Sequence, residues 1–355
     1  MKNFLYSIAA GERTDWIAQL VRVPLFLFSL IYGLAVKAIL FGYKVGILRR
    51  RRLSVPVISI GNLTLGGVGK TPMVIFVARM LKIKKLRTVI LTRGYMPQKE
   101  QLLAAQENYL SDEAEVLRQM LEGVPVVVNP DRYEGGLEAI KKYTPDVIIL
   151  DDGFQHWRLF RDLDIVLVDS VNPFGNGCLL PCGILREEAS SLRRAGLVVL
   201  TKTDRGEVGE LKEKIQRINP NAPIVQTVHR PMSLTNIFTK SLVQIAKLNQ
   251  AVVAFCGIGD PKSFRSTLAF LGADVKEFVP FEDHHYYSLQ DMDRLKSMCV
   301  TLGLRVLVTT QKDAVKLAEF KDFWQGFEIF SLNIEIDIIQ GHHEFIDRID
   351  RLLSH

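Results

Sequence analysis

Residues 55–72 (VPVISIGNLTLGGVGKTP) have the types and spacing of a phosphate-binding loop. The apolar run 55–60 predicts a buried strand, and the glycine-rich loop after it ends in Lys70 and Thr71. Glycines let backbone N–H groups close around phosphate oxygens, and the start of the following helix adds partial positive charge. Lys70 is expected to reach the β- and γ-phosphates, and the Thr71 hydroxyl is expected to bind Mg²⁺. The predicted nucleotide-binding residues are Thr64, Leu65, Gly66, Gly67, Val68, Gly69, Lys70 and Thr71.

One position departs from the usual G-x-x-x-x-G-K-[ST] pattern, because Thr64 stands five residues before Gly69. Gly66 and Gly67 are expected to supply the flexibility that a first glycine would give. The alternative interpretation is a plain glycine turn before a helix. The apolar run in front of the loop and Pro72 near the helix start favour phosphate binding.

A second acidic motif, Asp151-Asp152-Gly153-Phe154-Gln155-His156, follows the apolar run 147–150. A carboxylate at the end of a buried strand can hold Mg²⁺ directly or through water. Adjacent carboxylates beside phosphate repel each other unless a cation lies between them. The motif therefore predicts a metal or phosphate site, with an acidic surface turn as the alternative.

Further polar residues follow other predicted strands. In a parallel sheet covered by helices, ligands bind at the carboxyl ends of the strands. The long segment 172–187 is punctuated by Gly and Pro, and loops of that length are usually functional. The residues expected to bind substrate on these grounds are Arg93, Tyr95, Arg132, Asn172, Arg186 and Glu187.

Two short motifs stay ambiguous from their residues alone. Asp112 follows Ser111 directly before a predicted helix, so either side chain can serve as a helix N-cap. Asp283-His284-His285 follows the predicted strand 275–279. This cluster can bind a metal, orient a catalytic carboxylate, or form a solvated turn.

The elements needed to position these residues form an α/β pattern. Near-continuous apolar runs alternate with charged helices, as in a doubly wound parallel sheet covered on both faces. We expect three parts: an N-terminal helix with a basic segment at 1–52, a P-loop core at 53–230, and a smaller α/β domain at 231–355 that closes over the site. The predicted strands are 55–60, 88–92, 124–129, 147–151, 165–169, 197–201, 252–256, 275–279 and 305–309.

The N-terminal part combines apolar and basic character. Residues 23–36 carry no charge, Lys37 interrupts the run, and four arginines occupy 49–52. A bilayer span needs roughly 20 apolar residues, so 23–43 could just reach across or lie in the interface. A buried helix is the alternative. Residues 16–99 hold fifteen Lys and Arg and no Asp or Glu, which indicates an anionic partner.

Anionic lipid is favoured as that partner, and nucleic acid is not expected, because aromatic residues do not alternate with the basic ones. The 44–52 segment suits either the phosphate of a lipid acceptor or the surrounding anionic lipid. The four scattered cysteines favour reduced thiols in a cytosolic setting. No obligate protein partner is evident.

Two functional classes remain from the residues. One is a Mg²⁺-dependent kinase that acts on a membrane-embedded acceptor, and the other is a membrane-recruited ATPase or GTPase switch. The kinase is favoured, because a switch does not need the additional acidic, histidine and 172–187 motifs.

The chain resembles the tetraacyldisaccharide 4′-kinase family of lipid A biosynthesis. The resemblance extends from the N-terminal segment to about Leu317 and rests on seven motifs in order: GNLTLGGVGKTP, RGY, SDE, DDGFQH, NPFGNG with LLPCGILRE, DHHYY and TTQKD. It implies transfer of the ATP γ-phosphate to the 4′-hydroxyl of a tetraacylated disaccharide 1-phosphate, giving lipid IVA. It also implies a monotopic or singly anchored protein at the cytoplasmic face of the bacterial inner membrane.

The resemblance assigns roles to individual residues. Asp112 matches the family's catalytic base, and His284 is favoured over His285 as its partner. Lys70 and Asp152 are expected to act in catalysis, and Thr71, Asp151 and Glu113 to hold Mg²⁺. His156 carries over with a less certain role. Gln311 stands where the family usually has Glu, so a charge role there is not expected.

Overall fold

The computed structural model describes residues 2–11, 13, 15–94 and 112–354. Contacts between Cα atoms divide the chain into two compact units, which are described separately here. The first unit comprises Met1–Arg93, Gly123–Val228 and Ile336–His355, and the second comprises Gly94–Glu122 and His229–Glu335. The chain passes from one unit into the other inside two long strands, β7 (Ile224–Asn236) and β12 (Glu328–Gln340).

This division differs from the boundaries expected from the sequence at two segments. Residues 94–122 belong to the second unit, although they lie within the expected P-loop core, and residues 336–355 belong to the first. The segment 336–355 contains helix α11 (His342–Leu353), which contacts other parts of the first unit. The Lys84 ammonium pairs with Asp350 at 2.8 Å, and the Phe76 ring packs on Phe345. Contacts between residues so distant in sequence leave no local pattern.

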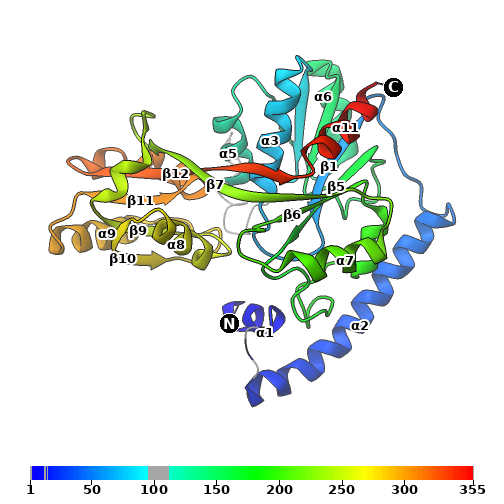
Figure 1. The fold of residues 1–355 in the computed structure, drawn as a ribbon, viewed down its shortest axis with the longest axis horizontal. Coiled ribbons are helices and arrows are strands. Elements are labelled where there is room, and N and C mark those ends of the chain that lie inside the picture. The colour runs from blue at the N-terminus through cyan, green and yellow to red at the C-terminus, as the bar shows by residue number, and fades with distance from the viewer. Residues whose placement is uncertain (1, 12, 14, 95–111, 355) are drawn as a thin grey trace. The chain divides into compact units, whose positions relative to one another are not determined.

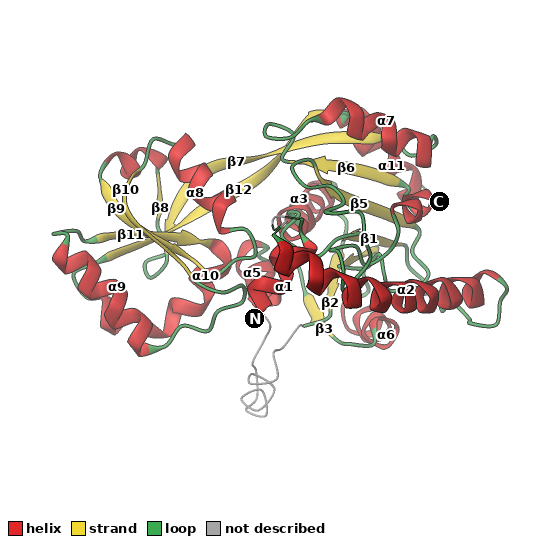
Figure 2. Ribbon diagram, turned by 90° about the horizontal axis from the view of Figure 1, so that it is seen from below, coloured by secondary structure: helices red, strands yellow, loops and turns green. Residues whose placement is uncertain are grey.

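The sheet of the first unit is parallel, with strand order β7-β6-β5-β1-β4-β2-β3. β1 lies in the middle and pairs with β4 on one side and β5 on the other (Figure 2). The doubly wound α/β prediction is therefore confirmed for this unit. Its strands are β1 (Val57–Asn62), β2 (Thr88–Thr92), β3 (Val126–Val128), β4 (Val147–Asp151), β5 (Leu163–Asp169) and β6 (Leu197–Thr201).

The apolar runs become strands that are buried on both faces. Every residue of β1, β2, β4 and β6 is buried, which explains their lack of alternation. β1 begins at Val57 rather than Val55, after Pro56, which has no N–H for the ladder. It continues to Asn62, which pairs with Leu167 of β5. The first residues of the phosphate-binding motif are therefore part of the sheet.

Helices of the first unit connect and cover these strands (Figure 1). α3 starts at Lys70, three residues earlier than the apolar pattern suggests, because Gly69 makes the turn with φ +87°. The helices are α1 (Lys2–Ala9), α2 (Trp16–Lys44), α3 (Lys70–Ile83), α6 (Arg132–Tyr143), η1 (Ala189–Arg194), α7 (Val208–Ile218) and α11 (His342–Leu353).

α2 is longer than its uncharged stretch, because Asp15 caps its first turn by accepting a hydrogen bond from the Ala18 N–H at 3.0 Å. In the described part of the chain it is the one helix long and apolar enough to cross a membrane by length and composition. Only 17% of its most apolar window is buried. Another side of α2 contacts the rest of the first unit. Tyr32 Oη donates to the carbonyl of Arg186 at 2.9 Å, and Lys37 pairs with Glu188 at 2.8 Å.

In the second unit the strand order is β10-β9-β11-β12-β7, with β8 antiparallel to β7. The first four strands are parallel. Two cores cover the faces of these strands, one around Phe255, Tyr287 and Trp324 and the other around Phe264 and Phe330. The remaining elements are α5 (Asp112–Met120), β8 (Leu242–Val243), η2 (Ile245–Asn249), β9 (Ala251–Cys256), α8 (Pro261–Phe270), β10 (Asp274–Pro280), α9 (Leu289–Thr301), β11 (Val306–Thr310), α10 (Gln311–Ala314), η3 (Val315–Phe320) and η4 (Asp322–Trp324).

Candidate active site

The loop between β1 and α3 has the backbone that the glycine motif requires. Gly66 and Gly69 have φ angles of +113° and +87°, which side chains of L residues rarely adopt. Thr64 differs, because it forms an isolated bridge with Leu185. Asn62 Nδ2 donates to the Thr64 carbonyl at 2.7 Å. A strand-like pairing accepts any residue, so this loop has no need of glycine at position 64.

Lys70, Asp152 and Arg186 form a charged cluster around this loop. The Lys70 ammonium lies 3.6 Å from Asp152 Oδ1, and Arg186 Nη1 lies 2.9 Å from Asp152 Oδ2. Burial acts to raise the pKa of Asp152, but Lys70 and Arg186 outweigh it and hold that pKa below its usual value. Asp152 is therefore ionised at neutral pH. Lys70 and Arg186 thus place two cations at Asp152, one of the two adjacent carboxylates.

Two neutral amides position the cluster. Lys70 Nζ donates to Asn62 Oδ1 at 3.3 Å, and Gln155 Nε2 donates to the Asn62 carbonyl at 3.0 Å. Gln155 Oε1 also accepts from Arg186 Nη1 at 3.4 Å. Sequence reasoning did not assign roles to either amide. A polar side chain directly before the glycine loop was the available signal for Asn62.

Glu187 is fully buried and neutralises Arg194 rather than facing solvent. Arg194 Nη1 lies 2.8 Å from Glu187 Oε2, and Gln155 Nε2 donates to Glu187 Oε1 at 3.2 Å. The Arg194 guanidinium also lies 4.5 Å from the centre of the Phe154 ring. These contacts make Glu187 a support of the loop that presents Arg186. Arg194 is a further residue that no motif identified.

Asp151 and Arg132 lie beside the cluster and are both buried. Thr92 Oγ1 donates to Asp151 Oδ2 at 3.3 Å, and Arg132 Nη2 donates to the Asp151 carbonyl at 3.5 Å. Burial lowers the pKa of Arg132 to about 10, against the opposing effect of Asp151 and Asp152, so the guanidinium stays charged at neutral pH. Arg93 is exposed after β2, and its charge also acts on Arg132.

His156 is neutral in the folded protein. Burial lowers its pKa to about 4, and the charges of Arg132 and Arg161 add to this effect. Its Nε2 atom is buried without a hydrogen-bond partner among the described residues. A neutral imidazole next to a cluster of cations adds no further positive charge there.

The other predicted residues of the first unit have varied surroundings. Asn172 ties its loop to the N-terminal segment, because its Nδ2 donates to the carbonyl of Ala10 at 3.4 Å and its Oδ1 accepts from the Gly175 N–H at 2.9 Å. Tyr95 lies outside the described residues. Asp112 is the first residue of α5, and its side chain is outside the described part as well.

The two histidines of the second unit differ in their partners. His284, at φ +59°, donates its backbone N–H to the Gly257 carbonyl at 3.2 Å, and its Nε2 lies 3.1 Å from Lys312 Nζ. His285 Nε2 instead lies 3.1 Å from Asp291 Oδ2, and its ring stacks on Phe281 with centroids 4.6 Å apart. The ring of His285 is therefore part of the packing, whereas His284 belongs to a polar group.

Asp313 organises the loop that carries these histidines. It is fully buried, and burial raises its pKa. Its Oδ1 accepts from the Gly257 N–H and from Tyr287 Oη, both at 3.0 Å, and its Oδ2 accepts from Thr310 Oγ1 at 2.6 Å. Gly257 in turn binds His284, so Asp313 fixes the backbone at that histidine.

The donor chemistry of the first unit fits Mg²⁺. Thr71 and Asp151 offer hard oxygen ligands, which Mg²⁺ prefers. Among the described residues no group of three His, Cys, Asp or Glu side chains could hold a metal. Mg²⁺ usually takes one or two carboxylates and completes its shell with water and phosphate oxygens.

The chain is similar to known proteins over most of its length. The sequence model of the family described as tetraacyldisaccharide-1-P 4′-kinase matches residues 21–354. A tetraacyldisaccharide 4′-kinase from Geobacter metallireducens is 40% identical over 84% of this chain and 89% of that protein. One from Halothermothrix orenii is 34% identical over 89% of this chain and 90% of that protein. A crystal structure of LpxK from Aquifex aeolicus in complex with ATP superimposes with a TM-score of 0.72, at 32% identity, covering 94% of this chain and 99% of that one.

Proposed function

This chain belongs to the tetraacyldisaccharide-1-P 4′-kinase family, and from that premise we propose which of its residues carry the reaction. It is an ATP-dependent kinase of lipid A biosynthesis that phosphorylates the 4′-hydroxyl of a tetraacyldisaccharide 1-phosphate. The observation that carries the residue assignments is the cluster of Lys70, Asp152 and Arg186 beside the glycine loop. A structural relative solved in complex with ATP supports this use of the loop.

In the proposed mechanism the loop from Thr64 to Thr71 binds the triphosphate. Its backbone N–H groups and the Lys70 ammonium face the phosphate oxygens. Asp152 and Asn62 hold the Lys70 side chain until phosphate competes for it, since both contacts are longer than 3.2 Å. Arg186 supplies a second cation at the same carboxylate. Phosphoryl transfer gains mainly from such positioning and charge stabilisation.

Mg²⁺ is proposed to bind at Thr71 and Asp151, where it would neutralise charge that develops on the phosphate oxygens. The Asp151 carboxylate is held by Thr92 and is buried, so its orientation is fixed before any ligand binds. Glu113 was predicted as a further ligand and lies on α5 of the second unit.

Asp112 is proposed as the base that accepts the proton of the acceptor hydroxyl, with His284 as its partner. Both residues belong to the second unit. The short helix α10 supports the pairing, because Gln311 Nε2 contacts Met120 Sδ of α5 at 3.4 Å while Lys312 Nζ lies 3.1 Å from His284. His285 fits this role less well, since Asp291 and Phe281 already engage its ring.

The protein is membrane-associated through α2, and we propose that it acts at the cytoplasmic face of the inner membrane, where ATP is available. The side of α2 bound to Arg186 and Glu188 supports a helix that lies in the interface rather than one surrounded by lipid. A lipid-linked acceptor in that interface needs no transfer through water to reach the site.

Incubation with γ-labelled ATP and the disaccharide 1-phosphate in detergent micelles tests the proposal. We expect label on the acceptor, with turnover lowered at least about a thousandfold in Lys70→Ala and unchanged in the control Lys82→Ala at the other, exposed end of α3. Asp112→Asn should lose turnover while ATP affinity survives, and Glu115→Gln on the same helix should keep both. ATP hydrolysis without label transfer would contradict the kinase, and full turnover in Asp112→Asn would contradict the base.

A further inference from the structure

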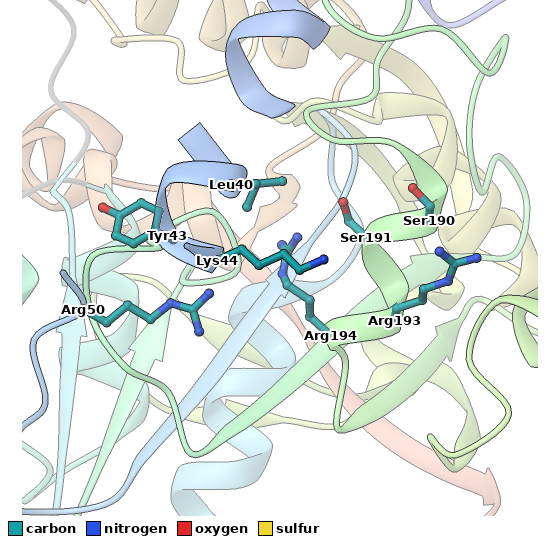
Figure 3. Close-up of a pocket in the computed structure, with 8 residues that line it drawn as sticks. All are labelled: Leu40, Tyr43, Lys44, Arg50, Ser190, Ser191, Arg193 and Arg194. Atoms are coloured by element: carbon teal, nitrogen blue, oxygen red, sulfur yellow. The ribbon is translucent and has the colours of Figure 1, made fainter. Parts of the chain in front are cut away.

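A pocket of about 600 Å³ lies in the first unit between the C-terminal end of α2 and the 3-10 helix η1. Its lining does not include Lys70, Asp152 or Arg186. It does include two cations of the 44–52 segment, for which the sequence leaves open an acceptor phosphate or the surrounding anionic lipid. Figure 3 shows its lining side chains, which come from α2, from the segment after it and from η1. The lining residues used below are Tyr43, Lys44, Arg50, Ser191, Arg193 and Arg194.

The pocket is strongly basic. Four of its lining residues are Lys or Arg, and no acidic residue lines it. Arg194 is neutralised by the buried Glu187 at 2.8 Å. Lys44, Arg50 and Arg193 are exposed and form no ion pair within the described residues, although the Arg50 guanidinium lies 5.8 Å from the centre of the Tyr43 ring. Three cations and two serine hydroxyls around one hollow match a phosphate group, which accepts hydrogen bonds at several oxygens.

The walls of the pocket are fixed to each other. Glu188, which precedes η1, pairs with Lys37 of α2 at 2.8 Å and accepts a hydrogen bond from Ser190 Oγ at 3.3 Å. Arg194 at the other end of η1 is held by Glu187 and Phe154. Lys44 and Arg193 therefore come from two elements that are tied together inside one unit, and Arg50 comes from the segment that follows α2.

Apolar side chains surround this end of α2 and identify the source of the phosphate. Phe41, Val45 and Ile47 are 62%, 49% and 76% exposed, on either side of Lys44. Water-soluble anions and nucleic acid gain nothing from such neighbours. A phospholipid has apolar chains for these residues and a phosphate at the depth that snorkelling cations reach.

We propose that this pocket binds the headgroup phosphate of an anionic membrane phospholipid, separate from the acceptor that is phosphorylated. Such binding would fix the C-terminal end of α2 at the headgroup level. The segment that follows, 49–52, leads directly into β1 and the phosphate-binding loop. The proposal does not depend on the residue roles proposed for catalysis, because its first test measures binding alone.

Vesicle sedimentation of the full chain tests the proposal with Arg50→Ala/Arg193→Ala. For vesicles that contain an anionic phospholipid we expect binding weakened about tenfold or more, since each cation near such a surface contributes measurably. Binding to purely zwitterionic vesicles should stay within about twofold. The matched control Lys141→Ala/Lys142→Ala removes two exposed cations from α6 and should change neither. Equal losses in the two double variants would overturn a specific pocket.

Two further measurements separate the sources of phosphate. Inorganic phosphate titrated without vesicles should bind too weakly to detect at millimolar concentration. The pocket would serve a free anion, and the proposal would fail, if two results came together. Inorganic phosphate would bind in a way that needs Arg50 and Arg193, and the double variant would bind vesicles as well as the unmodified chain does.

The second measurement concerns the acceptor. In detergent without phospholipid, the acceptor KM of the double variant should match that of the unmodified chain. A raised KM would make the pocket an acceptor subsite and would also overturn the proposal. Unchanged ATP affinity and thermal unfolding confirm that the variants fold.

Discussion

Asp152 shows how the site keeps its charges in place without a ligand. Its carboxylate lies between Lys70 and Arg186, and its backbone has φ +50°, in the left-handed region that non-glycine residues rarely adopt. Such strain persists where the surrounding contacts outweigh it. The strand end and the two cations supply those contacts here. A carboxylate in this position holds the Lys70 ammonium beside the glycine loop, where we propose that it meets phosphate.

His156 gives a pH dependence that can be measured. Its pKa is about 4 in the folded chain, against the ordinary histidine value of 6.5, so the unfolded chain binds the proton first as pH falls. Because the unfolded chain binds more protons in this range, falling pH favours unfolding. The free energy of unfolding therefore decreases from about pH 6.5 down to about pH 4, and His156 does not affect it above that window. At pH 5 the loss is at most about 2 kcal/mol.

Urea unfolding at pH 7 and pH 5 checks this prediction in the unmodified chain and in His156→Gln. The substitution itself lowers stability, so the quantity compared is the difference between the two pH values. We expect that difference to shrink by about 1–2 kcal/mol in His156→Gln. The exposed His343→Gln serves as control and should leave it unchanged. An identical pH dependence in all three proteins would mean that His156 is not a neutral buried histidine.

At the scale of elements, the sequence predicts most strands of the first unit because they are buried on both faces. β2, β4 and β6 have the predicted bounds, since an uninterrupted apolar run ends where the strand ends. Predicted site residues that follow β1, β4 and β5 do meet around one loop, as Lys70, Asp152 and Arg186 show. Asn62, Gln155 and Arg194 could not be predicted, because neutral amides and a lone arginine have no motif and acquire their roles only through tertiary contacts.

The loop 172–187 depends on a close approach at Gly183. A Cβ added there would collide with the carbonyl of Cys178, and the Gly183 N–H already donates to the Leu179 carbonyl at 2.9 Å. The Cys178 carbonyl is part of the backbone, so it cannot move aside for an added Cβ as the end of a flexible side chain could. Gly183→Ala should therefore shift the segment that presents Arg186, lower kinase turnover at least about tenfold, and cost about 1–3 kcal/mol of stability.

Gly209→Ala is the matched control for that experiment, because its added Cβ would meet nothing within 4 Å and it lies in helix α7. Alanine is the better helix former by up to about 1 kcal/mol, so this variant should be as stable or more stable, with unchanged turnover. Turnover and chemical unfolding of the two variants provide the comparison. A Gly183→Ala protein that behaves like Gly209→Ala would show that the turn relaxes freely.

At the scale of the molecule, α2 is the element that we propose to contact the membrane surface. One side of the helix is bound to the first unit, and the other presents Leu27, Ile31 and Leu34, which are 59%, 66% and 71% exposed. Their spacing of four and three residues places them on one face. Transfer of three large apolar side chains from water is worth several kcal/mol in total.

We expect Leu27→Ser/Ile31→Ser/Leu34→Ser to weaken binding to zwitterionic vesicles by on the order of a hundredfold or more, with little effect of salt. Turnover in detergent micelles shows whether the variant is folded, and we expect it to be retained at saturating acceptor. The control replaces three exposed leucines elsewhere, Leu137, Leu242 and Leu289, with serine. Similar losses in both triple variants would indicate general hydrophobicity rather than a binding face on α2.

The packing of α11 on α3 also constrains the order in which the protein can be completed during synthesis. Phe76 stacks edge-on against the fully buried Phe345, and Arg348 Nε donates to the carbonyl of Gly196 at 3.0 Å. Residues 229–335, which make up most of the second unit, leave the ribosome between these partners. The first unit therefore cannot complete the packing of α11 on α3 until residues 229–335 have been made. The apolar α2 emerges long before that, so it is available to its surroundings while the last helix of its own unit is still missing.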